Sequence, residues 1–240
     1  MAENLLGVVN RILAAPAPVL CLDTCALLDI IRVPARFHEN KISVNIITAA
    51  FELISKASTN PPDLWILILE LVEKEWLENA SNVHTDLKKH LNSLHYALDH
   101  FSKALDRIET DISFYKTDLR SLNIDNKLYS LSEKLLKLAI IMENDDNCKI
   151  KAMDRVSIDA APAGSKHGKN EAKDCMIVEH YLCLCQELRN NAFVEKCLFV
   201  SSNTQDYGHP QRLRSPLDVE FANINLIFAK DIAMANSMIK

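Results

Sequence analysis

The sequence predicts an α/β fold in which a central parallel sheet of four to five strands is covered by helices on both faces. Two observations lead to this prediction. Short, predominantly apolar runs of strand length alternate with segments of helical pattern, which is typical of a parallel sheet buried on both sides. Proline and glycine are both absent between Pro62 and Pro162, so the middle of the chain is predicted to be mostly helix.

Four apolar runs are predicted to form the strands, because each has the length and composition of a buried strand. They are residues 19–23 (VLCLD), 64–69 (LWILIL), 196–202 (KCLFVSS) and 224–229 (INLIFA). Helices are predicted at residues 26–33, 42–57, 70–79, 169–188 and 231–239. The first fifteen residues carry Glu3 and no basic leader, so they are predicted to form an amphipathic helix instead of a secretory signal.

The segment between the second and third predicted strands carries a heptad repeat. Apolar residues recur at alternating steps of four and three from Leu87 to Leu122, as in a helix with one continuous apolar seam. After the sequence NIDNK, a second apolar stripe runs from Leu128 to Met142. A long antiparallel helical hairpin is the simplest arrangement that satisfies both stripes.

We therefore expect a single domain over residues 1–240, with a core formed by about 16–79 and 150–240 and an inserted helical hairpin at 80–149. The charges of the hairpin nearly balance, which indicates a solvated surface and not a basic arm. Periodicity leaves open whether its seam packs on its own return helix, on a second copy of the chain in a homodimer, or on a partner protein.

Composition bears on the partners and the location of the protein. The formal net charge is −5, so the chain lacks the overall basic character of many nucleic-acid-binding proteins. No apolar run approaches the roughly 18 residues needed to cross a membrane, and no membrane partner is expected. Several of the seven cysteines lie in apolar segments and are expected to be free thiols packed as small hydrophobic groups. Free thiols indicate a reducing, cytoplasmic location.

Four carboxylates lie at or near the ends of predicted elements. Asp23 directly follows the first apolar run, Glu75 lies on the helix after the second, and Asp174 lies on the helix before the third. Asp206 follows the third strand. Because ligands of open parallel sheets bind beyond the carboxyl ends of the strands, we expect these four side chains to come together there.

Such a cluster has a chemical meaning. Carboxylates crowded into one site repel one another, and several would be protonated unless a cation lay between them. Ligand sets made only of oxygen atoms suit Mg²⁺ or Mn²⁺. Two such ions about 4 Å apart can activate a water and stabilise the leaving oxygen of a phosphodiester. The pattern therefore indicates a Mg²⁺ or Mn²⁺ site.

Each acidic residue also has an ordinary structural explanation when it is taken alone. Asp23 could cap the helix that follows it, and Asp206 could be a turn residue. Glu75 could be a solvated helix residue, and Asp174 could pair with a basic residue of its own helix. It is the combination of the four, in this order along the chain, that favours the metal site.

Four segments carry a resemblance to a known family. They are LDTCALLDII (22–31), LILELVEKEWLEN (67–79), NEAKDCMIVEHYL (170–182) and FVSSNTQDYG (199–208), in that order. Together they resemble the PIN domain family of metal-dependent nucleases. The resemblance implies a PIN-like three-layer fold, in which Asp23, Glu75, Asp174 and Asp206 are the catalytic carboxylates and hold one or two Mg²⁺ or Mn²⁺ ions.

Three positions differ from the pattern of the family. Cys25 lies where asparagine is common, Ser201 replaces a threonine, and Asn203 occupies a position that often holds the fourth acid. The resemblance implies that Ser201 and Asn203 belong to the catalytic site and orient the last carboxylate or a water. Asp206 would then carry the charge that Asn203 lacks.

Polar and basic residues near the motifs are candidates for substrate binding. Lys166 and Lys169 belong to the sequence GSKHGKN, which does not have the spacing of a phosphate-binding loop but precedes the third acidic motif. Thr24, at the start of the first helix of the core, is a further predicted substrate-binding residue. Arg212 and Arg214, which follow the last motif, are weaker candidates for contact with a phosphate backbone.

The predicted function is hydrolysis of RNA by a metal-dependent endonuclease that leaves a 3′-hydroxyl and a 5′-phosphate. The preference for RNA, a toxin or defence role, and a protein inhibitor or activator follow from the resemblance alone. Two alternatives stay open. One is a DNA-directed nuclease of the same fold. The other is a binding or scaffold protein whose metal site has decayed and whose hairpin carries the function, a reading that Asn203 favours.

Overall fold

The structure is a computed structural model that describes residues 2–32, 44–108, 118, 120–164 and 172–239. At its centre is a five-stranded sheet with the strand order β3-β2-β1-β4-β7, in which every neighbouring pair is parallel. The strands are β1 (Val19–Leu22), β2 (Trp65–Leu69), β3 (Ile140–Met142), β4 (Cys197–Val200) and β7 (Leu226–Ala229). The prediction of an α/β fold with a parallel sheet and a helical insertion is confirmed.

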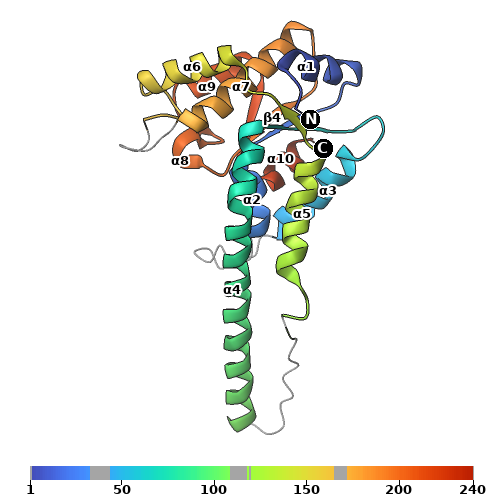
Figure 1. Cartoon of the computed structure of the whole chain (residues 1–240), viewed down its shortest axis with the longest axis vertical. Coiled ribbons are helices and arrows are strands. Elements are labelled where there is room, and N and C mark those ends of the chain that lie inside the picture. Colours follow the sequence, from blue (N-terminus) through green and yellow to red (C-terminus); the bar gives the residue numbers. More distant parts are fainter. Residues whose placement is uncertain (1, 33–43, 109–117, 119, 165–171, 240) are drawn as a thin grey trace.

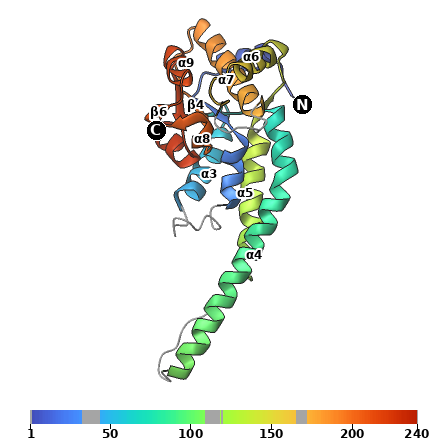
Figure 2. The same cartoon turned by 90° about the vertical axis from the view of Figure 1, so that its left-hand side faces the viewer.

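Helices cover both faces of the sheet (Figures 1 and 2). One face carries α1 (Leu5–Ala14), α6 (Asp146–Ser157), α7 (Ala172–Asn190) and α9 (Leu217–Asn223). The other face carries α2 (Thr24–Arg32), α3 (Val44–Ala57), α5 (Ile124–Leu138) and α10 (Ile232–Ile239). Because both faces are covered, the central strands β1 and β4 are buried at every residue, which explains their uninterrupted apolar sequences.

Short elements close the carboxyl end of β4. They are α8 (Thr204–Tyr207) and the two-residue strands β5 (Gly208–His209) and β6 (Arg212–Leu213). The ring of Tyr207 packs edge-on against Phe199 of β4 at a centroid distance of 5.0 Å, and the ring of Tyr181 of α7 lies 5.5 Å from Phe199. These aromatic contacts fix the α8 turn on the sheet.

The helix α4 (Glu70–Ile108) has 39 residues and begins directly after β2. At 1.5 Å per residue it is about 58 Å long, and it extends far beyond the sheet (Figure 2). The predicted insertion therefore starts within one continuous helix and not after a break at residue 80. In the described part of the chain, no helix combines the length and the apolar character needed to cross a membrane.

The apolar seam of α4 is covered only near the sheet. Leu87 and Leu91 are buried, whereas Phe101 and Ile108 are 56% and 77% exposed. The return helix α5 packs against α2 and α3 as well as α4, so it belongs to the core (Figure 1). Residues 109–117 and 119 of the predicted seam lie outside the described residues.

The second apolar stripe does not continue as a helix to Met142, and that part of the prediction is wrong. The helix α5 ends at Leu138, Ala139 has an extended backbone with ψ 142°, and residues 140–142 form the edge strand β3 beside β2. The β-branched residues Ile140 and Ile141 favour this extended form. A short apolar run fits both the 3.6-residue period of a helix and the two-residue period of a strand, so the sequence pattern did not distinguish a helix from a strand here.

A buried serine links α5 to α4 and α2. The side chain of Ser132 on α5 accepts a hydrogen bond from Trp76 Nε1 on α4 at 2.9 Å and donates one to the carbonyl of Leu27 on α2 at 2.8 Å. Ser132 is fully buried. A single hydroxyl thus satisfies the indole N–H and joins three helices that come from distant parts of the sequence.

We expect Ser132→Ala to lower the free energy of unfolding by about 1–3 kcal/mol, because it leaves the buried indole N–H of Trp76 without an acceptor. Urea denaturation would measure the change. Ser130→Ala, on the exposed side of the same helix, is the matched control, since it carries the same change in helix propensity. Equal stability changes for the two variants would contradict the linking role of Ser132.

Candidate active site

The carboxyl ends of β1 and β4 meet at the centre of the sheet. Leu22 pairs with Val200 at the end of the ladder, and the backbone N–H of Asp23 donates to the carbonyl of Val200 at 3.0 Å. The chain leaves β1 toward β2 on one side of it, while β4 lies on the other. This is the topological switch point of the sheet, where open parallel sheets bind their ligands.

The carboxylate of Asp23 is buried at this point, with 4% of the residue exposed. Its Oδ1 accepts a hydrogen bond from the N–H of Thr24 at 2.6 Å. Its Oδ2 accepts hydrogen bonds from Ser201 Oγ at 2.6 Å and from Cys25 Sγ at 3.2 Å. Burial raises the pKa of Asp23 and the negative charge of Glu75 adds to the increase, whereas these three hydrogen bonds act in the opposite direction.

A chain of hydrogen bonds joins Asp23 to Asp206. Ser201 Oγ, which donates to Asp23, accepts a hydrogen bond from the N–H of Asn203 at 3.1 Å. The amide of Asn203 donates to Asp206 Oδ2 at 2.5 Å, and Asp206 is buried. Ser201, Asn203 and Asp206 thus follow β4 as one turn that is connected to Asp23 by hydrogen bonds.

Arg214 holds this turn in place. Its guanidinium donates to the carbonyl of Asp206 at 2.9 Å and to the carbonyls of Pro162 and Ala163 at 3.2 and 3.0 Å. The side chain that the sequence offered as a weak phosphate contact is therefore engaged with the backbone. It ties the Asp206 turn to the loop that precedes α7.

Glu75 lies on α4 beside the start of α2. Thr24 Oγ1 donates to Glu75 Oε2 at 2.7 Å, and the ammonium of Lys173 on α7 lies 2.8 Å from Glu75 Oε1. The side chain of Glu75 is 17% exposed. The alternative explanation from the sequence, that Glu75 is a solvated helix residue, therefore does not describe it. Thr24, which the sequence suggested for substrate binding, contacts this carboxylate.

Asp174 is half-buried near the start of α7. Its backbone carbonyl accepts a hydrogen bond from the hydroxyl of Tyr207 at 3.3 Å. Burial raises the pKa of Tyr207, and the negative charges of Asp23 and Asp174 add to the increase, which places both carboxylates within electrostatic reach of one ring. The two lysines of the same region, Lys166 and Lys169, lie outside the described residues.

Cys25 contributes more than the sequence indicated. Its thiol donates to Asp23 Oδ2, accepts a hydrogen bond from the N–H of Ser202 at 3.1 Å, and lies 3.3 Å from Ser201 Oγ. Burial, together with the charge of Asp23, raises the pKa of Cys25, so the thiol stays protonated and remains a donor. The only signal in the sequence was its position two residues after Asp23, where it was noted as a departure from the family pattern.

The chemistry of the donor set fits a hard divalent cation. Asp23, Glu75, Asp174 and Asp206 supply only oxygen atoms, which is the preference of Mg²⁺ and Mn²⁺. As the side chains lie, however, no three His, Cys, Asp or Glu residues of the described ranges converge closely enough to hold a metal ion. Oxygen atoms of Glu75 and Asp206 are engaged instead by Lys173 and Asn203.

In the absence of divalent cations, we expect Asp23→Asn to raise the melting temperature at neutral pH by a few degrees. The folded protein holds the proton of Asp23 more tightly than the unfolded chain, so this group lowers stability as the pH rises above 3.8 and through the raised pKa. Asparagine has no charge to bury, and its amide can donate to Ser201 Oγ, whose hydroxyl can turn to accept.

Thermal unfolding in EDTA over a pH series would measure this effect. Asp86→Asn, an exposed position on α4, is the control and should leave the pH dependence unchanged. A melting temperature below that of the wild type at neutral pH, with Asp86→Asn unaffected, would show that the ionised carboxylate of Asp23 stabilises the fold instead.

Comparison with known families agrees with this geometry. The family model described as PIN domain matches residues 20–207, from within β1 to the α8 turn that carries Asp206. No curated protein and no solved structure matches the chain significantly. Members of this family are generally nucleases, and they typically use divalent metal ions. Because the matched range covers most of the sequence and encloses the whole candidate site, the chain belongs to the PIN domain family.

Proposed function

We propose that the protein is a metal-dependent endoribonuclease whose active site lies where β1 and β4 end. One observation carries this proposal. The carboxylate of Asp23 is buried at the topological switch point and is connected by hydrogen bonds through Ser201 and Asn203 to a second buried acid, Asp206. Buried carboxylates held in this way are costly unless they serve a charge that arrives with a ligand.

The hydrogen bonds around Asp23 leave it prepared for a ligand. A carboxylate has about four lone-pair positions, and Thr24, Cys25 and Ser201 occupy three of them. A divalent cation, when bound, would supply Lewis-acid stabilisation of the phosphodiester and lower the pKa of an attacking water. Asp23 would hold that charge together with Glu75, Asp174 and Asp206, while Ser201 and Cys25 fix the rotamer of Asp23.

Lys173 has a second task in this proposal. Its ammonium pairs with Glu75, yet its side chain is 51% exposed and can leave. When Glu75 turns to a cation, the ammonium becomes available to the phosphate of a substrate. Lys173 thus neutralises the acidic site before binding, and contacts the nucleic acid afterwards.

The choice of RNA rests on the resemblance to the family, because carboxylates do not distinguish RNA from DNA. A DNA-directed nuclease of the same fold would use the same residues. A toxin or defence role also stays a prediction of the resemblance. Cleavage of RNA and DNA versions of one sequence would separate the two substrates.

We expect the purified protein to cleave total RNA with Mn²⁺ and to lose this activity with EDTA. Asp23→Asn should lower the rate by more than about 100-fold, since even outer partners of a metal site contribute about 10- to 100-fold. Time courses with both proteins would measure the ratio, and thermal unfolding would verify that the variant is folded. Equal cleavage by the two proteins would show that the activity belongs to a contaminant or to another site.

A second function is favoured by one observation. Lys173 occupies the carboxylate of Glu75, and no three ligating side chains converge within the described residues. This is the arrangement expected if the metal site has decayed and the protein acts as a binding or scaffold protein. In that case neither Mn²⁺ nor Mg²⁺ would stabilise the fold.

The exchange between Lys173 and a cation gives a direct test. We expect Mn²⁺ to raise the melting temperature, and Lys173→Met to reach half of that increase at a several-fold lower Mn²⁺ concentration, because no ammonium has to be displaced. Lys149→Met is the matched control, since Lys149 pairs with the exposed Asp146 on α6. No Mn²⁺ response in any of the three proteins would support the scaffold function.

A further inference from the structure

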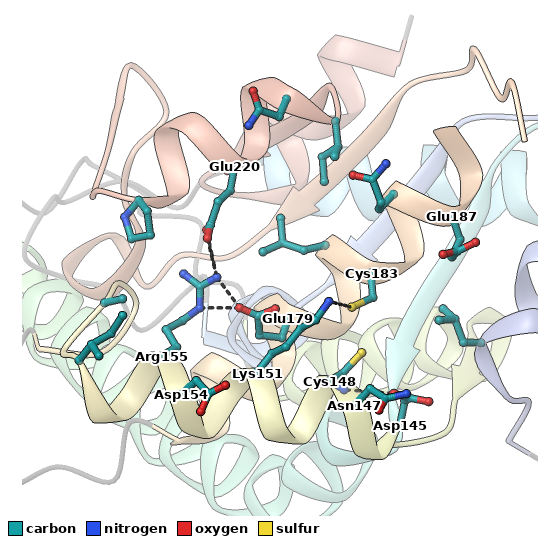
Figure 3. Close-up of a pocket in the computed structure, with 18 residues that line it drawn as sticks. Asp145, Asn147, Cys148, Lys151, Asp154, Arg155, Glu179, Cys183, Glu187 and Glu220 are labelled. Carbon is teal, nitrogen blue, oxygen red and sulfur yellow. Dashed lines mark hydrogen bonds and ion pairs between the residues drawn. The ribbon is translucent and has the colours of Figure 1, made fainter. Parts of the chain in front are cut away.

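A cavity of about 690 Å³ lies between α6, α7 and α9, and the predicted acidic residues do not line it. Figure 3 shows its walls, where charged side chains from the three helices surround two sulfur atoms. The sulfur atoms belong to Cys148, in the first turn of α6, and Cys183, in the middle of α7. Nothing in the nuclease proposal uses this cavity.

The two thiols lie in the same cavity. Cys148 and Cys183 line it from two helices that pack against each other, and Figure 3 shows their sulfur atoms turned toward each other. Cys148 is 1% exposed, whereas Cys183 is half-buried. A small molecule in the cavity therefore meets Cys183 first and Cys148 behind it.

A cation lies beside Cys183. Lys151, one turn after Cys148 on α6, places its Nζ 3.6 Å from Cys183 Sγ (Figure 3). The nearest acid on α7, Glu179, is held by Arg155 through a hydrogen bond of 2.7 Å from Nε. Arg155 reduces the negative charge of Glu179 at the sulfur, where the ammonium of Lys151 acts in the opposite direction to Glu179.

The other charged groups around the cavity are less direct. On α9, Glu220 accepts hydrogen bonds from Arg155 at 3.0 Å. The acids Asp145, Asp154 and Glu187 also line the cavity, while α1 contributes only the apolar Leu5. These contacts therefore leave Lys151 as the cation at the Cys183 sulfur, while Glu179 and Glu220 share Arg155.

This setting separates Cys183 from the other thiols. Its interaction with Cys148, together with the charge of Lys151, lowers the pKa of Cys183, although burial and the negative charge of Glu179 act in the opposite direction. The pKa of Cys148 is raised, first by the same interaction, and the pKa of Cys25 is raised by burial. At neutral pH Cys183 is therefore present as the nucleophilic thiolate to a larger extent than an unperturbed thiol.

We propose that Cys183 is a modification site that reacts with peroxides entering the cavity, and that Cys148 resolves the product as an α6–α7 disulfide. The Cys183 thiolate attacks one oxygen of hydrogen peroxide, the O–O bond breaks, and hydroxide leaves and takes up a proton to give water. The resulting sulfenic acid is attacked by the sulfur of Cys148, which loses its proton as an S–S bond forms and a second water leaves. Two thiols are oxidised by two electrons, and one peroxide is reduced to two waters.

Peptide mapping by mass spectrometry tests this proposal on the full-length protein. After brief treatment with one equivalent of hydrogen peroxide, we expect a Cys148–Cys183 cross-link as the first product. In Cys148→Ala the disulfide cannot form, and dimedone should label a sulfenic acid at Cys183. Oxidation that begins at Cys25 or another thiol, or a Cys183 that is not labelled in Cys148→Ala, would overturn the proposal.

The role of Lys151 gives a second readout that does not depend on disulfide geometry. Alkylation of Cys183 by iodoacetamide at pH 7 should slow by roughly threefold to fivefold in Lys151→Met, with the pH profile moving to higher pH. Lys149→Met makes the same change of side chain two residues earlier, on another side of α6, and should leave the rate unchanged. Equal rates for Lys151→Met and the wild type would remove the electrostatic basis of the proposal.

Neither experiment measures RNA cleavage. Failure of the nuclease proposal would therefore leave this one intact, and a negative result at Cys183 would leave the nuclease proposal intact. The two sites lie in different parts of the fold. Asp23 and Asp206 follow β1 and β4, whereas the two thiols line the cavity between α6, α7 and α9.

Discussion

The parallel pairing of β1 with β4 is the constraint on which the rest of the site depends. The ladder runs in register from Val19 with Cys197 to Leu22 with Val200, and it brings Asp23 and Ser201 to the same edge. The hydroxyl of Ser201 then closes the gap with a 2.6 Å hydrogen bond to Asp23. A shift of one residue in this register would send Asp23 to the opposite face and break its hydrogen bond with Ser201.

The site combines buried negative charge with donors that are neutral. Asp23 is surrounded by a backbone N–H, a hydroxyl and a thiol, none of which cancels its charge. The ammonium of Lys173 pairs with Glu75. The described residues thus hold Asp23 in a fixed orientation while its charge remains uncompensated, which is a state that an incoming cation stabilises.

Much of the core was predictable from the sequence, because buried parallel strands are continuous apolar runs. The residues that follow them lie together at the carboxyl edge of the sheet. Asp23 and the turn from Ser201 to Asp206 were found for this reason. The ion pair of Lys173 with Glu75 was not, since it joins two helices through tertiary packing that no local pattern encodes. The strand β3 was missed because a short apolar run fits the period of a helix as well as that of a strand. The pair of Cys148 with Cys183 was missed because the spacing of the two residues in the sequence matches no known cysteine motif.

The helix α4 also has a mechanical consequence. It is rooted at the end of β2, carries Glu75 in its second turn, and is held near that root by the hydrogen bond from Trp76 to Ser132. Because Leu87 and Leu91 are buried, the part of the helix that is free to act as a lever is the stretch from Leu91 to Ile108, about 26 Å long. A sideways load on Ile108 is therefore taken up by the packing around Leu91 and Leu87, about 24 Å before it would reach Glu75 along the helix.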